Sequence, residues 1–421
     1  MARLRVCVCT SYSVSVEPRA PRHAVAVANL SDEIEVVLID CIPQGQPRIT
    51  PRLFEGVRNL EYRTNYYPYR GAGRARLLFE KMKYWMSRQV YRTFGSLRAG
   101  ALSTRAMKLE SLLLDAKADV YMGYNIDALL PVSRAAARVG AVTVFDCQEF
   151  YSDMGQWQTG LDRELIRSVE RKYLPACDLV LAASDEMADE LVRFYGIKRP
   201  LPLYNVPPLQ AELPGEKIEG FNLYWRNSSI NLSSRGLGDG LAALSLLPPD
   251  IKLHVQGRLS EQGREELERR TRELGINERV IVHSPYEPHE AINAASRYTV
   301  GLCLEQSGCR NHDVTVSNKM FDYMMAGLPV VASDLPGLRD VVKRSGGGLL
   351  FESGRAEDLA SKIMMLYRDR ELLDQTAGRA RGFALSEGNL DAEMKKLQDA
   401  FSALVNSKMK VERQAIQALS I

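Results

Sequence analysis

The chain has 421 residues, of which 45% are hydrophobic and 25% are charged, as in an ordinary globular protein. This length is enough for two domains with full cores. The net charge of +3 is too small to indicate a nucleic-acid partner by itself. No apolar run approaches the roughly 18 residues that a membrane-spanning helix needs. The seven scattered cysteines, with no CxxC pair, are typical of reduced thiols in the cytosol.

The first half of the chain alternates between apolar runs and helical patterns. The N-terminal sequence MARLRVCVCTSYS predicts a first strand rather than a signal peptide. Continuous apolar runs separated by amphipathic segments are typical of βαβ units with parallel strands. Strands are expected at 4–9, 34–42, 119–124, 141–146 and 179–183, an aromatic-rich segment at 60–69, and helices at 23–30, 129–139 and 163–173 and from 184 onward.

Residues 70–105 differ from the rest of this half because basic and aromatic side chains are interleaved there. The stretch contains one acidic residue, Glu80, and nine basic residues: Arg70, Arg74, Arg76, Lys81, Lys83, Arg88, Arg92, Arg98 and Arg105. A basic amphipathic helix with Trp and Tyr can lie on an anionic membrane surface. The alternative is a domain helix whose basic side is solvated.

A change of composition marks a domain boundary. The stretch 199–215, RPLPLYNVPPLQAELPG, holds five prolines, as linkers often do. We therefore expect an N-terminal domain over 1–199, a linker over 200–216 and a C-terminal domain over 217–390. Helices over 391–421 are expected to pack back toward the N-terminal domain.

After the linker the alternation of strands and helices starts again. Strands are expected at 221–225, 251–256, 279–283, 299–304, 330–332 and 349–351, and helices at 238–247, 261–274, 289–296, 320–326, 358–367 and 392–405. The chain therefore predicts two α/β sandwiches of similar size.

The stretch SNKMFDYMMAGLPVVASD, residues 317–334, combines a polar start, a one-faced helix and a buried strand. Its apolar side chains share one face, so Lys319, Asp322 and Tyr323 are expected on a polar side. The free N-terminus of such a helix suits a phosphate, because its N–H groups are unpaired and it carries partial positive charge.

Other anion-binding features precede this stretch. Arg226 follows a strand, Arg235 with Gly236 opens the next helix, and Gly257 would let the backbone approach a ligand closely. Guanidinium groups and a helix N-terminus at strand ends would together hold a diphosphate. Asp322 could accept hydrogen bonds from a ribose diol. A single Arg in a loop or a single acid on a helix is more often a solvated surface residue, so the order of these residues along the chain is the stronger indication.

In the first half, DCQEF places Asp146 and Glu149 just past a strand, where ligands collect in open α/β sheets. Helix capping is an equal competitor for these carboxylates. The chain has no GxSxG, P-loop or HExxH motif, and its five histidines show no metal spacing, so no metal is expected.

In combination these segments resemble the family 4 glycosyltransferases, which are retaining enzymes of GT-B architecture. The most specific part is SNKMFDYMMAGLPVVASDLPG, supported by DCQEFYSD, ERKYLPACDLVLAASDEMADEL, YNVPP and SSRGL. The resemblance implies two Rossmann-like α/β/α domains that face each other across a cleft, with no cofactor beyond the substrate, a UDP- or GDP-linked sugar.

The resemblance also implies roles for individual residues. The C-terminal domain would bind the donor, and the N-terminal domain would bind the acceptor near Arg22, Asp146, Gln148 and Glu149. Asp313, Asp322 and Glu149 are the candidates for catalytic roles. The donor-binding candidates are Arg226, Arg235, Gly257, Tyr286, Ser317, Asn318, Lys319 and Asp322.

The sequence departs from the family pattern at three positions. Asp322 stands where the family has the second Glu of its Glu-seven residues-Glu motif. Val314 stands in place of the first, for which Asp313, Asn311 or His312 could substitute. Gln148 stands where the family often has His, and a Gln cannot titrate.

The function implied is retaining transfer of a sugar to a lipid-linked or polysaccharide-precursor acceptor, in the cytoplasm or at the inner face of a membrane. Two alternatives stay open: a nucleotide-sugar epimerase of the same fold, and a non-catalytic nucleotide-sugar-binding subunit.

Overall fold

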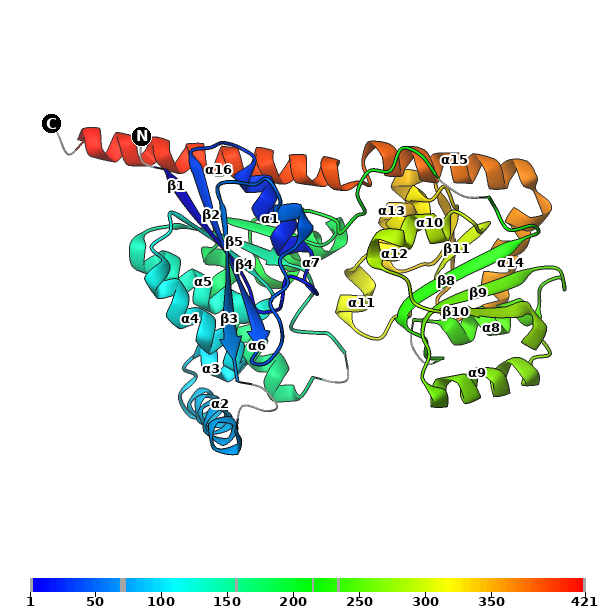
Figure 1. Ribbon diagram of the computed structural model, residues 1–421, viewed down its shortest axis with the longest axis horizontal. Coiled ribbons are helices and arrows are strands. Elements are labelled where there is room, and N and C mark those ends of the chain that lie inside the picture. The colour runs from blue at the N-terminus through cyan, green and yellow to red at the C-terminus, as the bar shows by residue number, and fades with distance from the viewer. Residues whose placement is uncertain (1–2, 69–72, 156–157, 214–215, 233–234, 419–421) are drawn as a thin grey trace. The chain divides into compact units, whose positions relative to one another are not determined.

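A computed structural model describes residues 3–68, 73–155, 158–213, 216–232 and 235–418, with the side chains of Pro288 and of 409–418 left undescribed. Contacts divide the chain into two units (Figure 1). Unit 1 comprises Met1–Leu203 and Met394–Ile421, and unit 2 comprises Tyr204–Glu393. Each unit is built around one parallel sheet, so the predicted pair of α/β domains is confirmed.

The sheet of unit 1 has the strand order β3-β2-β1-β4-β5-β6-β7, and all its neighbouring strands are parallel. Its strands are β1 Leu4–Thr10, β2 Ile34–Pro43, β3 Leu60–Tyr67, β4 Val120–Tyr124, β5 Val142–Cys147, β6 Leu179–Ala182 and β7 Leu201–Pro202. Its helices are α1 Arg19–Ala28, α2 Arg74–Phe94, α3 Ala99–Leu102, α4 Thr104–Ala116, α5 Ile126–Val139, α6 Gly160–Tyr173 and α7 Asp185–Tyr195, with 3-10 turns at Arg52–Phe54 and Leu174–Ala176.

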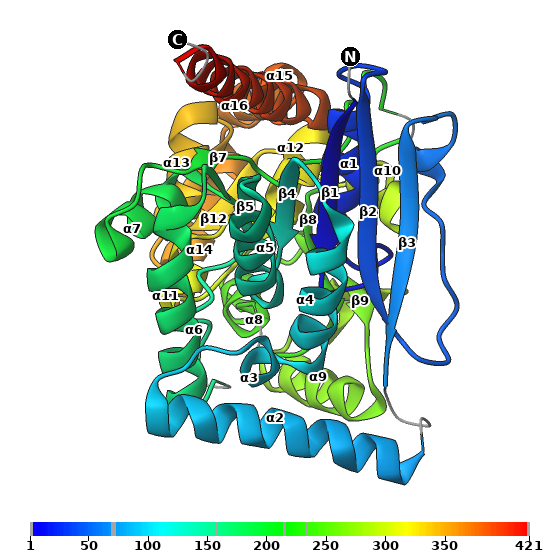
Figure 2. The same ribbon diagram turned by 90° about the vertical axis from the view of Figure 1, so that its left-hand side faces the viewer.

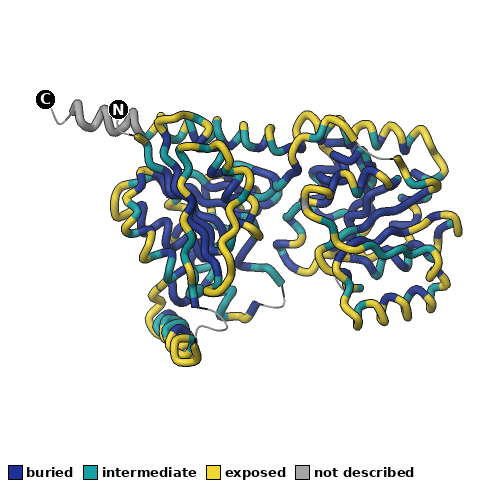
Figure 3. Tube along the Cα trace, viewed as in Figure 1, coloured by how far each residue is buried: buried dark blue, intermediate teal, exposed yellow. Residues whose placement is uncertain are grey.

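Alternate residues of β1 pack on opposite faces of this sheet. Val6 and Val8 contact the cluster to which α1 and the C-terminal helix contribute, whereas Cys7 and Cys9 contact α4 and α5. Both faces are covered, which explains why the strands are apolar throughout rather than alternating. Figure 3 shows the strands of both units as buried and much of the outer helices as exposed.

The sheet of unit 2 has the order β10-β9-β8-β11-β12-β13 and is also parallel. Its strands are β8 Asn222–Ser229, β9 Lys252–Arg258, β10 Val280–His283, β11 Val300–Cys303, β12 Val330–Ser333 and β13 Gly348–Phe351. Its helices are α8 Leu237–Ser245, α9 Glu261–Glu273, α10 Ala291–Ala295, α11 Arg310–Val314, α12 Asn318–Met325, α13 Pro336–Ser345, α14 Ala356–Arg368 and α15 Arg370–Ser386, with 3-10 turns at Asn277–Arg279 and Pro288–Glu290.

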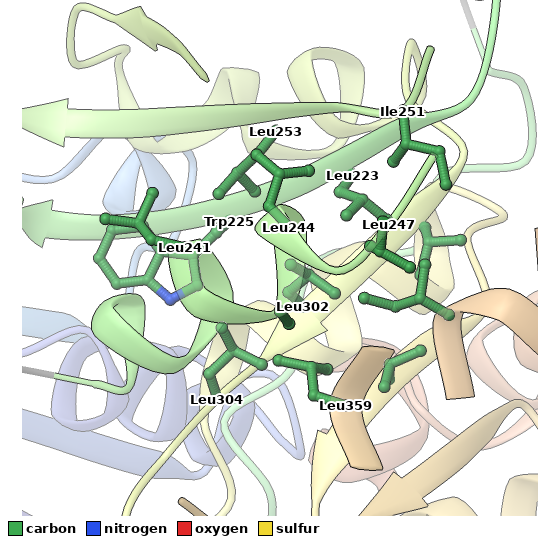
Figure 4. Close-up of a cluster of buried hydrophobic side chains, with 14 of the residues drawn as sticks. Leu223, Trp225, Leu241, Leu244, Leu247, Ile251, Leu253, Leu302, Leu304 and Leu359 are labelled. Atoms are coloured by element: carbon green, nitrogen blue, oxygen red, sulfur yellow. The ribbon is translucent and has the colours of Figure 1, made fainter. Parts of the chain in front are cut away.

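Trp225 belongs to the larger core of unit 2, where it lies at one end of the cluster beside Leu241 of α8 (Figure 4). It is fully buried, and its indole N–H donates to the backbone oxygen of Arg235 at 3.3 Å. Burying a large apolar side chain contributes roughly 1.5–3 kcal/mol. This packing also fixes the loop that carries Arg235, so the core positions a candidate site residue.

The last helix, α16 (Leu390–Ala418), begins in unit 2 and continues into unit 1. Within unit 1 its Leu397 and Phe401 are buried in the core. The proline-rich stretch is partly buried as well, because Tyr204 and Val206 belong to a core cluster of unit 2. Among the described residues, no helix is both long and apolar enough to cross a membrane.

Candidate functional site

The order of strands in unit 2 reverses between β8 and β11, with helices on both faces of the sheet. In an open parallel sheet, ligands bind beyond the carboxyl ends of the strands at such a switch point. Arg226 lies in the second half of β8, and Glu305 follows β11 by two residues. The donor-binding residues that the sequence suggested are therefore expected at this edge.

Arg226 is held by two residues of α12. Its guanidinium forms an ion pair with the Asp322 carboxylate, and its backbone N–H donates to the Tyr323 hydroxyl at 3.0 Å. The sequence suggested separate roles for Arg226 at a diphosphate and for Asp322 at a ribose. The structure brings the two together, so each Asp322 contact to a ligand would compete with the guanidinium.

A second ionic cluster joins Glu305, Lys319 and Arg235. The Lys319 ammonium lies 2.7 Å from Glu305 Oε1, and the two side chains are only 5% and 8% exposed. Arg235 lies 3.9 Å from the same oxygen but is 46% exposed. Burial favours the neutral acid, yet the two cations outweigh it and hold the pKa of Glu305 below its ordinary value.

Glu305 is not among the residues that the sequence predicted at this site. The only signal was an acid shortly after a buried strand, at the edge where ligands collect, and no motif marked it. Its Oε2 has no hydrogen-bond partner among the described residues. Among the described residues, the cationic side chains Arg226, Arg235 and Lys319 are paired at this edge with the carboxylates Asp322 and Glu305.

The polar side predicted for α12 is not open to solvent. Lys319, Asp322 and Tyr323 are 5%, 9% and 0% exposed. This expectation was wrong because α12 is packed from both sides, and its polar groups are paired with Glu305 and Arg226 instead. Ser317 precedes the helix without capping it through its side chain. Ser317 is half-buried, whereas Asn318 is exposed.

Two glycines beside these clusters are required by the backbone. A Cβ at Gly236, where φ is +69°, would lie 1.9 Å from the Leu304 oxygen. A Cβ at Gly257, where φ is +154°, would lie 2.2 Å from the oxygen of Asn227. The sequence analysis explained Gly257 by a close ligand, but the close neighbour in the structure is the adjacent strand.

The remaining donor-side candidates, Tyr286 and Asp313, do not belong to either ionic cluster. Tyr286 is half-buried, and its hydroxyl has no hydrogen-bond partner among the described residues. Asp313 lies in the short helix α11, and one of its carboxylate oxygens is buried with no partner in the described part of the chain. An unpaired polar atom of this kind is a candidate for contact with a ligand.

In unit 1 the candidate Asp146 forms an ion pair with a residue of the same unit. Both of its carboxylate oxygens accept hydrogen bonds from the Arg19 guanidinium, at 2.7 and 2.9 Å, and the side chains are 1% and 5% exposed. The sequence named Arg22 instead of Arg19. Arg22 is half-buried, and burial followed by the nearby Arg19 lowers its pKa. Asp146 therefore fastens α1 to β5.

Gln148, which stands where the family often has His, belongs to a polar chain. Its amide nitrogen donates to Glu17 at 2.9 Å, and its oxygen accepts from the Asn125 amide at 3.2 Å. Burial raises the pKa of Glu17. Glu149 beside it is half-buried. Within the described residues, no group of three or more His, Cys, Asp or Glu side chains could hold a metal ion.

Two family models match the chain in sequence. One, described as a glycosyl transferase 4-like domain, matches residues 16–203, and the other, described as glycosyl transferases group 1, matches residues 234–369. Together the two models show that the chain is a glycosyltransferase. The first model lies within unit 1 and the second within unit 2. The second match includes Arg235, Glu305 and Lys319. No curated protein matches this glycosyltransferase in sequence.

Solved structures confirm the GT-B architecture of this glycosyltransferase. HepE of Anabaena in complex with UDP-glucose is 13% identical, with a TM-score of 0.67 over 95% of this chain and 100% of that one. Sucrose-phosphate synthase of Thermosynechococcus elongatus is 14% identical, with a TM-score of 0.69 over 96% and 100%. WaaG, a glycosyltransferase involved in lipopolysaccharide biosynthesis, is 14% identical, with a TM-score of 0.62 over 94% and 98%. At these identities the likeness concerns the fold.

Proposed function

We propose that this glycosyltransferase moves a hexosyl or related sugar from a UDP- or GDP-linked donor to a lipid-linked or polysaccharide-precursor acceptor, with retention at the anomeric carbon. The observation that carries the proposal is the cluster of three cationic side chains at the switch point of unit 2. Arg226, Arg235 and Lys319 come from three different segments and converge on one edge. A similar structure was solved with UDP-glucose.

The chemistry follows from where charge develops. As the bond from the anomeric carbon to the diphosphate oxygen breaks, negative charge grows on the leaving group and positive charge on the sugar. Fixed cations stabilise the diphosphate without having to reorganise. Arg235 is the best placed for direct contact because it is the most exposed of the three. Lys319, which is buried and paired with Glu305, acts over a slightly longer range.

In the proposed step the acceptor hydroxyl attacks the anomeric carbon on the face from which the diphosphate departs. The new bond forms between the acceptor oxygen and the anomeric carbon, and the hydroxyl proton passes to a departing phosphate oxygen. No enzymic nucleophile is required. Asp313, Asp322 and Glu149 remain the proposed carboxylates for orienting the sugar and the acceptor, and Ser317, Asn318 and Tyr286 for contacts to the donor.

A thermal-shift screen with UDP, GDP, ADP and their sugars tests donor binding. A ligand at one hundred times its Kd stabilises the folded state by about 2.7 kcal/mol, which moves the melting temperature measurably. We expect a shift with a UDP or GDP sugar. If no nucleoside diphosphate shifts the melting temperature, the donor assignment is wrong.

The reaction itself is tested by product analysis with a panel of glycan and lipid-linked acceptors. Retention predicts an α-linked product from an α-linked donor, read from the anomeric proton coupling by NMR. A β-linked product would contradict retention. Donor conversion without any acceptor would favour the epimerase, and binding without turnover across the panel would favour a non-catalytic subunit.

A further inference from the structure

Helix α2 turns its large apolar side chains away from unit 1. The exposed fractions are 69% for Leu78, 51% for Phe79, 47% for Met82, 61% for Trp85 and 52% for Met86. Their spacing places all five on one face of the helix. We call this face the outer stripe. A stripe of this kind on a globular protein is normally buried against the core, so its exposure needs an explanation.

The opposite face of α2 is polar and is the one that packs on unit 1. Arg88 forms an ion pair with Asp162 of α6 at 2.6 Å. The Tyr91 hydroxyl lies 2.9 Å from that of Ser168, also in α6. Glu80 and Tyr91 are the buried residues of the helix. Figure 2 shows α2 lying along one end of unit 1, next to α3 and α6. The helix is therefore inverted relative to an ordinary surface helix.

Basic residues border the outer stripe on both sides. By their positions in the helix, Arg74, Lys81 and Arg92 lie along one margin, and Arg76 and Lys83 along the other. The Lys83 ammonium lies 4.3 Å from the centre of the Phe79 ring, so its stem follows the apolar surface. The only acid of the helix, Glu80, is on the packed face.

We propose that the outer stripe and its basic margins are a docking surface for an anionic lipid bilayer, with α2 lying in the plane of the interface. The five apolar side chains would enter the acyl boundary, and the margins would meet the lipid phosphates. A second copy of this chain is the poorer occupant, because pairing two outer stripes would bring margins of the same sign together. The surface does not depend on which sugar is transferred.

This assignment narrows the surface that the sequence suggested. The segment after α2 does not take part, because Leu97, Ala99 and Ala101 are buried. Arg105 does not take part either, because it forms an ion pair with the buried Asp127 at 3.0 Å. The docking surface is thus α2 itself, and not the whole of 70–105.

Vesicle flotation tests the proposal with the full-length protein. The probes are vesicles of phosphatidylcholine alone and of phosphatidylcholine mixed with phosphatidylglycerol, with no sugar substrate present. We expect binding to the mixed vesicles, weakened at least tenfold in the stripe variant Phe79→Ser/Trp85→Ser/Met86→Ser. In the margin variant Arg74→Ser/Lys81→Ser/Arg92→Ser, each lost charge should weaken binding roughly fivefold. Added salt should weaken binding of the wild type as well.

The matched control is Val139→Ser/Leu246→Ser, which removes two apolar side chains that are 48% and 57% exposed elsewhere. It should float as the wild type does, and circular dichroism melting should show all variants folded. Equal flotation of the wild type and the stripe variant would overturn the proposal. The proposal would also be overturned if light scattering showed the wild type to be a dimer that binds no vesicles, and if the stripe variant were a monomer. Because donor binding is scored separately by thermal shift, failure here leaves the proposed reaction untouched.

Discussion

The two units share the same order over six parallel strands, to which unit 1 adds β7, but their sheets carry different polar side chains at the edge where ligands bind. In unit 1, Arg19 and Asp146 satisfy each other almost completely out of water. In unit 2, Lys319 and Glu305 are equally buried, but Arg235 stands beside them nearly half exposed. A paired, closed edge stabilises the fold, whereas an edge with an exposed extra cation can bind an anion. We therefore propose that the first edge stabilises the fold and that the second binds the donor.

The largest effect on stability is expected from breaking the buried ion pair of unit 1. Arg19→Met leaves Asp146 buried without a partner, and breaking one side of a buried ion pair costs about 3–5 kcal/mol. Urea denaturation should show this loss in the free energy of unfolding. The double variant Arg19→Met/Asp146→Leu removes both charges and should recover most of it. A loss below about 1 kcal/mol in the single variant would show that the pair is not buried as described.

A smaller effect is expected from His23, which is buried at the same edge and whose Nδ1 lies 2.8 Å from the Tyr124 hydroxyl. Burial, followed by the charge of Arg19, lowers its pKa from 6.5 to about 3. The unfolded chain takes up the proton below pH 6.5 while the folded chain does not, so stability falls as pH drops. Between pH 7 and pH 5 this amounts to about 2 kcal/mol.

The measurement is the free energy of unfolding at pH 7 and pH 5 for the wild type and for His23→Gln. The variant keeps a side chain able to hydrogen-bond Tyr124 but cannot titrate. It should therefore lose about 2 kcal/mol less than the wild type on acidification. Parallel pH curves for the two proteins would contradict the account of His23.

The smallest effect distinguishes two carboxylates on the donor side of unit 2: Glu305, and Asp313, which was the candidate for the family's first Glu. Glu305 touches both Lys319 and Arg235, whereas Asp313 lies on the neighbouring short helix. We expect Glu305→Gln to lower kcat/KM for the donor by about tenfold, or 1.4 kcal/mol, because both cations lose their orientation. Asp313→Asn should change it less. Steady-state kinetics in which Asp313→Asn is the more damaging substitution would reverse this assignment.

Much of the fold followed from local patterns. Continuous apolar runs such as β2 and β5 indicated parallel strands, because only a sheet covered on both faces leaves no polar side. Arg235 and Lys319 were predictable as well, since each lies close to a helix start. Arg226 was expected just after a strand, but it lies within β8, which continues to Ser229. Strands and helix starts of this kind can be predicted because they depend on residues that are close together in the sequence.

Pairings between distant residues could not be predicted in the same way. Nothing in the sequence couples Arg19 to Asp146 or Glu305 to Lys319, since each pair forms only when separate segments meet at a sheet edge. The orientation of α2 was also open. Its pattern revealed two faces, but the usual rule buries the apolar one, and here polar contacts to α6 bury the other.

The most direct test of the donor-binding edge is calorimetry of UDP and GDP binding to the wild type and to Arg235→Ala. Losing a charge-assisted contact should cost about 1.5–3 kcal/mol, a tenfold to hundredfold weaker Kd. The control Arg269→Ala removes a guanidinium that is 61% exposed on α9 and should bind as the wild type does. Unchanged affinity in Arg235→Ala would remove this residue from the site and contradict the contrast between the two edges.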